Sequence, residues 1–175
     1  MRKVLLIFGQ LSDTDVDWLT QQGVRKLMPA GATLIHHGTA VESVFVVLDG
    51  SLGVFAANNV RIAQVGTGDI LGEMSLVDSG LSAASVVVET DAVVLAVAKA
   101  VLLDKLTRDV GFAARFYRAL AMFLAERMRS SIRRMGYGSD QMPGDELGDE
   151  IDPDVLDKVH LAGARFERML KKLAP

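Results

Sequence analysis

Between Val24 and Val97 the chain consists of short runs rich in β-branched residues, which glycines interrupt at close intervals. The runs are Ala32 to His36, Val44 to Leu48, Leu52 to Phe55, Arg61 to Val65, Ser85 to Val88 and Ala92 to Val97. Such runs are typical of β-strands, because branched side chains fit a pleated surface. Turn residues separate them, at Pro29-Ala30-Gly31, Asp49-Gly50, Asn58-Asn59 and Gly66-Thr67-Gly68-Asp69. The pattern predicts hairpin-linked, mostly antiparallel strands in a barrel, sandwich or jelly roll.

Helical segments are expected on both sides of this region. Ser12 or Asp13 can cap a short N-terminal helix that ends before Gly23. After Lys99 we expect a short helix over Val101 to Thr107 and then a long one. The long helix is indicated by apolar residues at helical spacing, which are Phe112, Phe116, Leu120, Phe123 or Leu124, Met128, Ile132 and Met135. The fold class is therefore mainly β with flanking helices (α+β).

The end of the chain divides into a linker and a further helix. Residues 136–152 are rich in glycine and acidic residues and contain Pro143. Asp152 and Pro153 then predict an N-cap and a first helical residue, and an amphipathic helix follows over residues 153–174. We thus divide the chain into a domain over residues 1–135, a linker and a C-terminal helix. One hypothesis is that the acidic linker folds back along the arginine-rich long helix.

Composition limits the function classes. The chain has no cysteine, which excludes disulfides and thiolate chemistry and favours a cytoplasmic location. The formal net charge of −3 recommends neither nucleic acid nor an anionic membrane as a partner. We expect a cytoplasmic protein with no membrane-spanning segment.

The segment Gly68-Asp69-Ile70-Leu71-Gly72-Glu73-Met74-Ser75-Leu76 indicates a ligand site, together with Ser82-Ala83-Ala84-Ser85-Val86. We call residues 72–86 the cassette. Its glycines let the backbone approach an anion closely, and the start of a short helix directs N–H groups at that anion. The carboxylate of Glu73 is an acceptor suited to a sugar hydroxyl. The cassette therefore suggests a phosphorylated sugar as ligand.

In the order and spacing of their turn motifs and the cassette, residues 8–135 resemble the cyclic-nucleotide-binding domains of the catabolite activator protein and of protein kinase A regulatory subunits. The resemblance implies a double-stranded β-helix (jelly-roll) barrel with an N-terminal helix and a long C-terminal helix. It also implies cAMP or cGMP as ligand, with the cassette backbone on the cyclic phosphate and Glu73 on the ribose 2′-hydroxyl. The candidate ligand-binding residues are Gly72, Glu73, Met74, Ser75, Ser82, Ala83 and Ser85.

This chain departs from the family at the arginine that pairs with the phosphate, because Ser82 occupies that position and the cassette contains no Lys or Arg. A charge-assisted hydrogen bond contributes about 1.5–3 kcal/mol and a neutral one about 0.5–1.5 kcal/mol. Serine in place of this arginine should therefore lower the affinity for the cyclic nucleotide by about one to two orders of magnitude. Arg61, on a neighbouring strand, either substitutes for the missing cation or is an ordinary exposed strand residue. The pocket is then either a weakened site or a degenerate one.

The resemblance also suggests an output. The long helix corresponds to the family's dimer seam and pocket lid, so we expect a homodimer through Phe112 to Met135, with simple packing on the barrel as the alternative. The chain after the linker leaves no room for a winged helix-turn-helix, so no DNA contact is expected. The favoured function is a cyclic-nucleotide sensor that signals to an unknown protein partner. The alternative is a ligand-free interaction or dimerisation module on the same fold.

An enzyme is the third class. His36, His37 and Glu42 come close to a cupin metal motif, but adjacent strand residues point to opposite faces, so both imidazoles cannot bind one metal. His160 lies far away in the C-terminal helix. No nucleophile motif is present and Glu73 has no second carboxylate of opposed role. We expect no catalytic residue, no metal and no resident cofactor.

Overall fold

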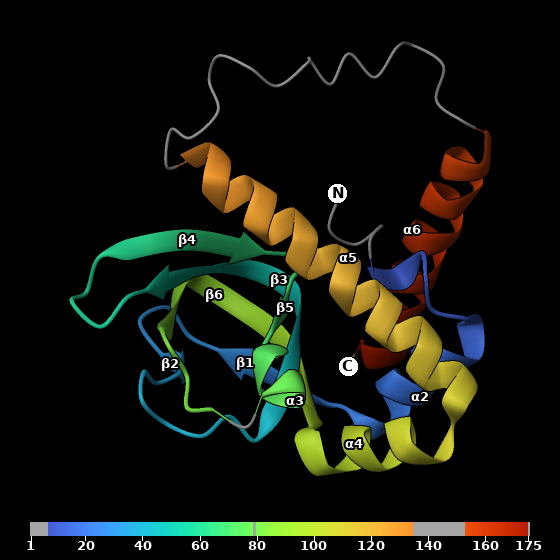
Figure 1. The fold of residues 1–175 in the computed structure, drawn as a ribbon, viewed down its shortest axis with the longest axis horizontal. Helices are drawn as coiled ribbons and strands as arrows, with labels where there is room; N and C mark the ends of the chain where they lie inside the picture. Colours follow the sequence, from blue (N-terminus) through green and yellow to red (C-terminus); the bar gives the residue numbers. More distant parts are fainter. Residues whose placement is uncertain (1–6, 79, 135–152, 175) are drawn as a thin grey trace.

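The computed structural model describes residues 7–78, 80–134 and 153–174 (Figure 1). The predicted linker, and with it the hypothesis that it folds back along the long helix, lies outside these residues. The elements in chain order are α2 (Asp13–Gln22), β1 (Val24–Met28), β2 (Thr33–Ile35), β3 (Ser43–Phe55), β4 (Arg61–Gly66), β5 (Ile70–Leu71), α3 (Met74–Val77), β6 (Ser85–Ala98), α4 (Lys99–Arg108), α5 (Val110–Arg134) and α6 (Pro153–Leu173).

The strands form one antiparallel sheet that rolls up beside a layer of helices, which confirms the predicted fold class. The strand order is β1-β6-β3-β4, with β2 paired to β6 and β5 paired to β3. The long pair of β3 and β6 holds the sheet together, with partners from Ser43 and Ala98 to Phe55 and Ser85. Figure 1 shows α5 running diagonally across the sheet from α4 toward β4.

The strand β3 is apolar without interruption over Val44 to Leu48 because both of its faces are buried. Side chains alternate between the two faces of a strand. Val44, Val46 and Leu48 therefore pack with the helices, in one core cluster that includes Phe112 and Phe123. Phe45 and Val47 point the other way, into a second cluster inside the roll. The sheet thus separates a helical core from a roll interior.

One predicted turn is not a turn, and two pairs of predicted strands are each one strand. Asp49 and Gly50 lie within β3, which runs unbroken from Ser43 to Phe55, and β6 likewise joins the two predicted runs Ser85 to Val88 and Ala92 to Val97. Irregular register near Asp49 and Ser51 absorbs the bend. Gly50 has a φ of 89°, and a Cβ there would lie 2.6 Å from the Cα of Ala92. A glycine that bends a strand over its neighbour looks like a turn in the sequence.

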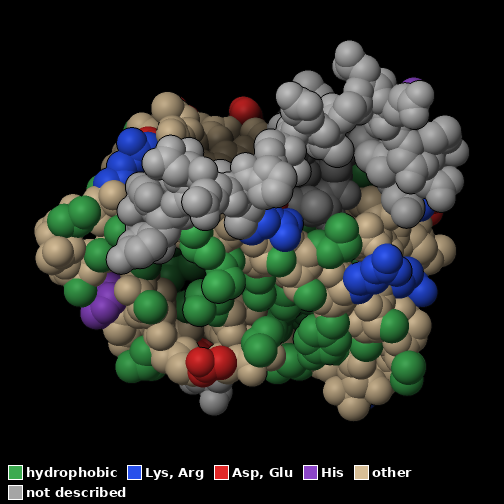
Figure 2. All heavy atoms as spheres, turned by 45° about the horizontal axis from the view of Figure 1, so that its top comes forward, with side chains coloured by type: hydrophobic (Ala, Val, Ile, Leu, Met, Phe, Trp, Pro, Cys, Tyr) green, Lys and Arg blue, Asp and Glu red, His purple; other side chains and the backbone are tan. Residues whose placement is uncertain are grey.

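The predicted helices form, with small shifts at their ends. Ser12 caps α2 by accepting a hydrogen bond from the backbone N–H of Asp15, as predicted. The apolar stripe of α5 is buried only in its first part, where Phe112, Phe116, Leu120 and Phe123 are inside. The remaining described members, Met128 and Ile132, are exposed. Figure 2, which turns the top of Figure 1 forward, shows hydrophobic side chains gathered on this side of the molecule, between groups of Lys and Arg.

The C-terminal helix α6 docks on α2 rather than on the barrel. Phe166 meets Phe8 edge to face, with 5.3 Å between the ring centroids. Around this apolar contact, two cations of α6 pair with acids of α2. Arg165 Nε lies 2.6 Å from Asp13 Oδ1, and Lys172 Nζ pairs with Asp17. The pairs are partly exposed, so the buried aromatic contact contributes most of the docking energy.

Candidate functional site

The cassette begins where β5 ends, at a glycine that the fold requires. Gly72 has a φ of 77°, a backbone conformation that L side chains rarely adopt. A Cβ at this position would lie 2.6 Å from the carbonyl oxygen of Ser43 on the neighbouring strand. The close approach turns the chain into the single helical turn α3 and places Glu73 directly before it.

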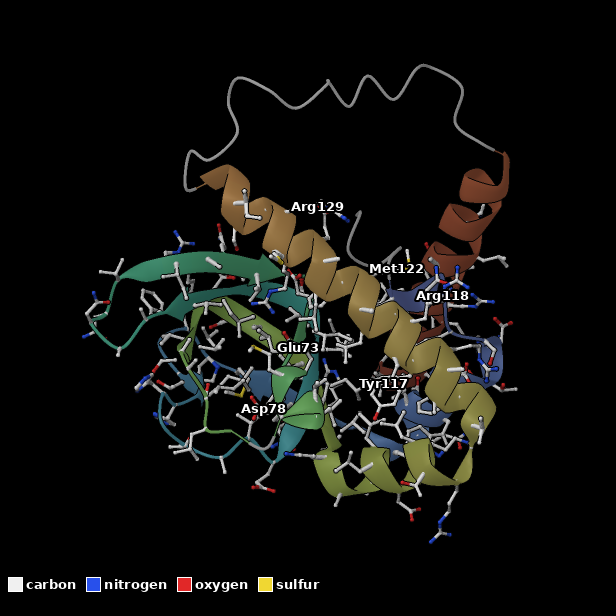
Figure 3. The ribbon with its side chains drawn as sticks, viewed as in Figure 1. Glu73, Asp78, Tyr117, Arg118, Met122 and Arg129 are labelled. Carbon is white, nitrogen blue, oxygen red and sulfur yellow. The ribbon has the colours of Figure 1, made fainter. Side chains whose placement is uncertain are left out.

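The carboxylate of Glu73 is buried and faces the long helix. Its residue is 3% exposed. Glu73 Oε1 accepts a hydrogen bond of 2.8 Å from Arg127 Nη1, where the Arg127 side chain is 32% exposed. Figure 3 shows Glu73 between α3 and α5. The guanidinium also lies over the ring of Phe123, with 5.5 Å from its carbon to the ring centroid. An ion pair therefore connects the cassette to α5.

The pKa of Glu73 is raised above its ordinary value. Burial is the largest cause, because a carboxylate loses its hydration there. The positive charge of Arg127 acts in the opposite direction, and the negative charge of Asp69 adds to the rise. Asp69 is itself buried, and its Oδ2 accepts a hydrogen bond of 2.8 Å from the backbone N–H of Gly66. Among these influences, the charge of Arg127 is the one that most favours the ionised form of Glu73.

The serines of the predicted site make hydrogen bonds with nearby backbone. The Ser75 hydroxyl donates to the carbonyl of Gly72 and the Ser82 hydroxyl donates to the carbonyl of Ala84, both at 2.7 Å. Ser85 Oγ accepts from the backbone N–H of His37 at 3.0 Å, which leaves its hydroxyl hydrogen to be donated elsewhere. Met74 and Ala83 are exposed. The hydroxyl of Ser82 is therefore turned onto the backbone of its own cassette.

A cavity of about 160 Å³ lies between β4 and α5. It is lined by Val54, Ile62, Ala63, Gln64, Val65, Asp69, Phe123, Glu126, Arg127, Ser130 and Ser131. None of the seven predicted ligand-binding residues lines the cavity. Glu73 is connected to it by the hydrogen bond that it accepts from Arg127, which does line the cavity. Sites for small molecules usually measure about 300–1,000 Å³, so this cavity is small for a nucleotide.

The structure points to Arg127, which the sequence interpretation missed, and away from Arg61. Arg61 Nη2 pairs with the carboxylate of Glu89 at 2.9 Å, and Arg61 is not among the cavity-lining residues. One signal could have revealed Arg127. It follows Phe123 by one helical turn and so falls within the apolar stripe of α5, where an arginine needs a buried partner.

The remaining candidates gain no support as sites. His36, His37 and His160 are all exposed. Among the described residues, no cluster of three or more His, Asp or Glu side chains is arranged to hold a metal ion. The described helices also include none that is long and apolar enough to cross a membrane. The expectation that the chain is not an enzyme stays a prediction.

Comparisons with known proteins identify the domain that carries this site. Residues 25–109 match the family model described as "Cyclic nucleotide-binding domain". These residues belong to the cyclic nucleotide-binding domain family. A cyclic AMP receptor protein of Thermus thermophilus is 30% identical over 129 residues, which are 71% of this chain and 58% of that protein. The chain thus spans little more than half the length of this curated relative.

Solved structures agree with the fold of a cyclic nucleotide-binding domain. A domain of this kind from Methylobacillus flagellatus superimposes with a TM-score of 0.70 at 22% identity, covering 81% of this chain and 85% of that one. The catabolite activator protein of Thermus thermophilus gives a TM-score of 0.60 at 24% identity, covering 96% of this chain and 86% of that one. At these identities the likeness concerns the fold.

The ion pair makes a prediction for the pH dependence of stability. In Arg127→Gln the pKa of Glu73 should rise further, because the charge that lowers it is gone. A raised pKa means that the folded state holds a proton the unfolded state has lost, so stability falls as pH rises. We expect a loss of about 1–3 kcal/mol in the free energy of unfolding at pH 8. The loss should shrink toward pH 5, because a protonated Glu73 in the folded state no longer needs the guanidinium charge.

Urea denaturation at the two pH values measures this, with Arg129→Gln as the matched control. Arg129 pairs with Glu126 one turn away on the surface, and its side chain is 62% exposed. Its removal should cost less than about 1 kcal/mol at either pH. Equal losses for Arg127→Gln at pH 5 and pH 8 would show that Glu73 does not depend on the guanidinium charge.

Proposed function

We propose that this domain is a regulatory sensor for a cyclic nucleotide, cAMP or cGMP, and that binding shifts α5. The observation that carries the proposal is the buried Glu73 of the cassette, held by Arg127 from α5. A buried carboxylate at the mouth of a Gly-containing turn is suited to a ribose hydroxyl. The name of the Thermus relative favours cAMP over cGMP.

The size of the cavity supports the coupling to α5. At about 160 Å³ it is small for a nucleotide in this conformation. One wall is formed by Phe123, Glu126, Arg127, Ser130 and Ser131, which all belong to α5. A ligand that enters must move this helix or its side chains, and it then favours the arrangement with the wider pocket. The position of α5 is therefore the proposed output.

Titration calorimetry with cAMP and with cGMP tests the ligand directly. We expect saturable binding to the wild type, and a fall of about tenfold or more in affinity in Glu73→Gln, because a neutral amide replaces a charged acceptor. Glu167→Gln is the matched control, since Glu167 is an exposed glutamate of α6, outside the cassette. It should bind as the wild type does.

The second candidate is a ligand-free interaction module on the same fold. The observation that favours it is the absence of Lys and Arg from the whole cassette, from Gly72 to Val86. Such a module would give no heat with either nucleotide at millimolar concentration. That result, in a folded wild-type protein, would reject the sensor and leave the helices as the working surface.

We also propose that two copies pair through α5. Its outer face carries apolar or small residues at alternating intervals of four and three, the spacing of a two-stranded coiled coil. The stripe is Val110, Ala114, Tyr117, Ala121, Leu124 and Met128. In this stripe Val110 is 79% exposed and Met128 66% exposed, although both are apolar. A second copy would cover them.

Analytical ultracentrifugation tests the pairing. The wild type should sediment as a dimer at micromolar concentration, and Ala121→Glu should sediment as a monomer because it places a charge in the middle of the stripe. Ala100→Glu, the same exchange at an exposed residue of α4, should remain a dimer. A monomeric wild type, or a dimer that tolerates Ala121→Glu, would contradict the proposed seam.

A further inference from the structure

The cassette contains no Lys or Arg, and α5 brings the cation Arg127 to the cassette residue Glu73. The cassette offers Ser82, whose hydroxyl is bonded to the carbonyl of Ala84. Arg61 is committed to Glu89. Among the described residues that line the cavity, Arg127 is the one Lys or Arg, and it touches Glu73 directly. The positive charge beside Glu73 therefore comes from the helix and not from the cassette.

We infer that Arg127 is the phosphate-binding residue of this domain, so that the ligand's anionic group is held by α5 instead of by the cassette. The inference rests on the proposed function. It assigns the ligand a negative charge close to the hydroxyl that Glu73 binds, as in a 3′,5′-cyclic nucleotide. It also makes α5 a direct participant in binding.

The chemistry of the ligand brings both contacts within reach of one guanidinium. In a 3′,5′-cyclic nucleotide the phosphate is esterified to the carbon next to the one that carries the 2′-hydroxyl. A group bonded to Glu73 is therefore also near the phosphate. The guanidinium has five N–H donors in a planar fork, and the hydrogen bond to Glu73 comes from Nη1. The other donors can bind phosphate oxygens without breaking the ion pair.

Electrostatics supports the same assignment. The phosphate must enter beside a buried carboxylate, and two anions in a site of low dielectric repel each other unless a cation lies between them. Arg127 is bonded to that carboxylate, and its side chain, 32% exposed, remains open to an incoming ligand. Its place over Phe123 limits the directions in which the guanidinium can turn.

A phosphate-binding residue on α5 couples the affinity for the ligand to the position of the helix. When the cation belongs to the barrel, a ligand can bind the barrel while the helix stays free. When the cation belongs to α5, phosphate affinity and helix position are one equilibrium, and each changes the other by the same factor. Anything that holds α5 in place, such as a second copy on its outer face, should then alter the affinity for the ligand.

The test compares cAMP with adenosine, which keeps the base and the 2′-hydroxyl but carries no phosphate. By calorimetry, Arg127→Gln should lower the affinity for cAMP about 10- to 100-fold and leave that for adenosine within about threefold. Adding Ser82→Arg to this variant returns a cation to the cassette and should recover most of the cAMP affinity. Arg129→Gln, on the exposed side of α5, should bind both ligands as the wild type does.

Each outcome decides the matter. A wild type that binds no cyclic nucleotide rejects the proposed function itself. A wild type that binds cAMP, beside an Arg127→Gln variant of equal affinity, rejects this inference alone. Equal losses for cAMP and adenosine, or no recovery with Ser82→Arg, show that Arg127 only shapes the pocket.

If Arg127→Gln fails to fold by circular dichroism, Arg127→Lys replaces it. The lysine keeps the charge but not the fork, so cAMP should weaken about threefold to tenfold and adenosine should not. Unchanged cAMP affinity there overturns the inference.

Discussion

The long antiparallel pair of β3 and β6 is buried on both faces, and the rest of the molecule is arranged around it. Val46 and Val97 face the helices, while Val47 and Val94 face the interior of the roll. The two cores share one sheet: residues of α5 lie in one core cluster with Val44, Val46 and Leu48 of β3, and β3 also pairs with β5, which leads into the cassette. The interior of the roll and the helical layer are therefore separated by a single sheet.

The ion pair of Glu73 and Arg127 adds a direct connection across the same boundary. Its carboxylate directly follows the turn at Gly72, and its guanidinium lies over Phe123 of α5. A rotation of α5 would therefore move the guanidinium that holds Glu73, and a ligand that moves Glu73 would displace Arg127 and with it α5. At the other end, Arg115 makes two hydrogen bonds of 2.6 and 2.8 Å to Asp15, which join α5 to α2. The helix is held at both ends by buried carboxylates.

The sequence predicted what depends on neighbouring residues. Alternating and helical spacings gave the antiparallel sheet and the positions of the helices, and the order of motifs led to Glu73. It could not show that Gly50 bends one strand instead of ending it, because a positive φ serves both purposes. Nor could it show which arginine of α5 meets Glu73, 54 residues away. That contact depends on how far the helix is rotated against the sheet, which only the packing of Phe116, Leu120 and Phe123 decides.

Signalling by this domain depends on α5 responding to a ligand at Glu73. Hydrogen–deuterium exchange of the full chain, with and without saturating cAMP, measures that response most directly. We expect the exchange of α5 amides around Arg127 to change on binding, while the amides of the buried pair β3 and β6 exchange as before. Binding of cAMP that leaves the exchange of α5 unaltered would contradict the account.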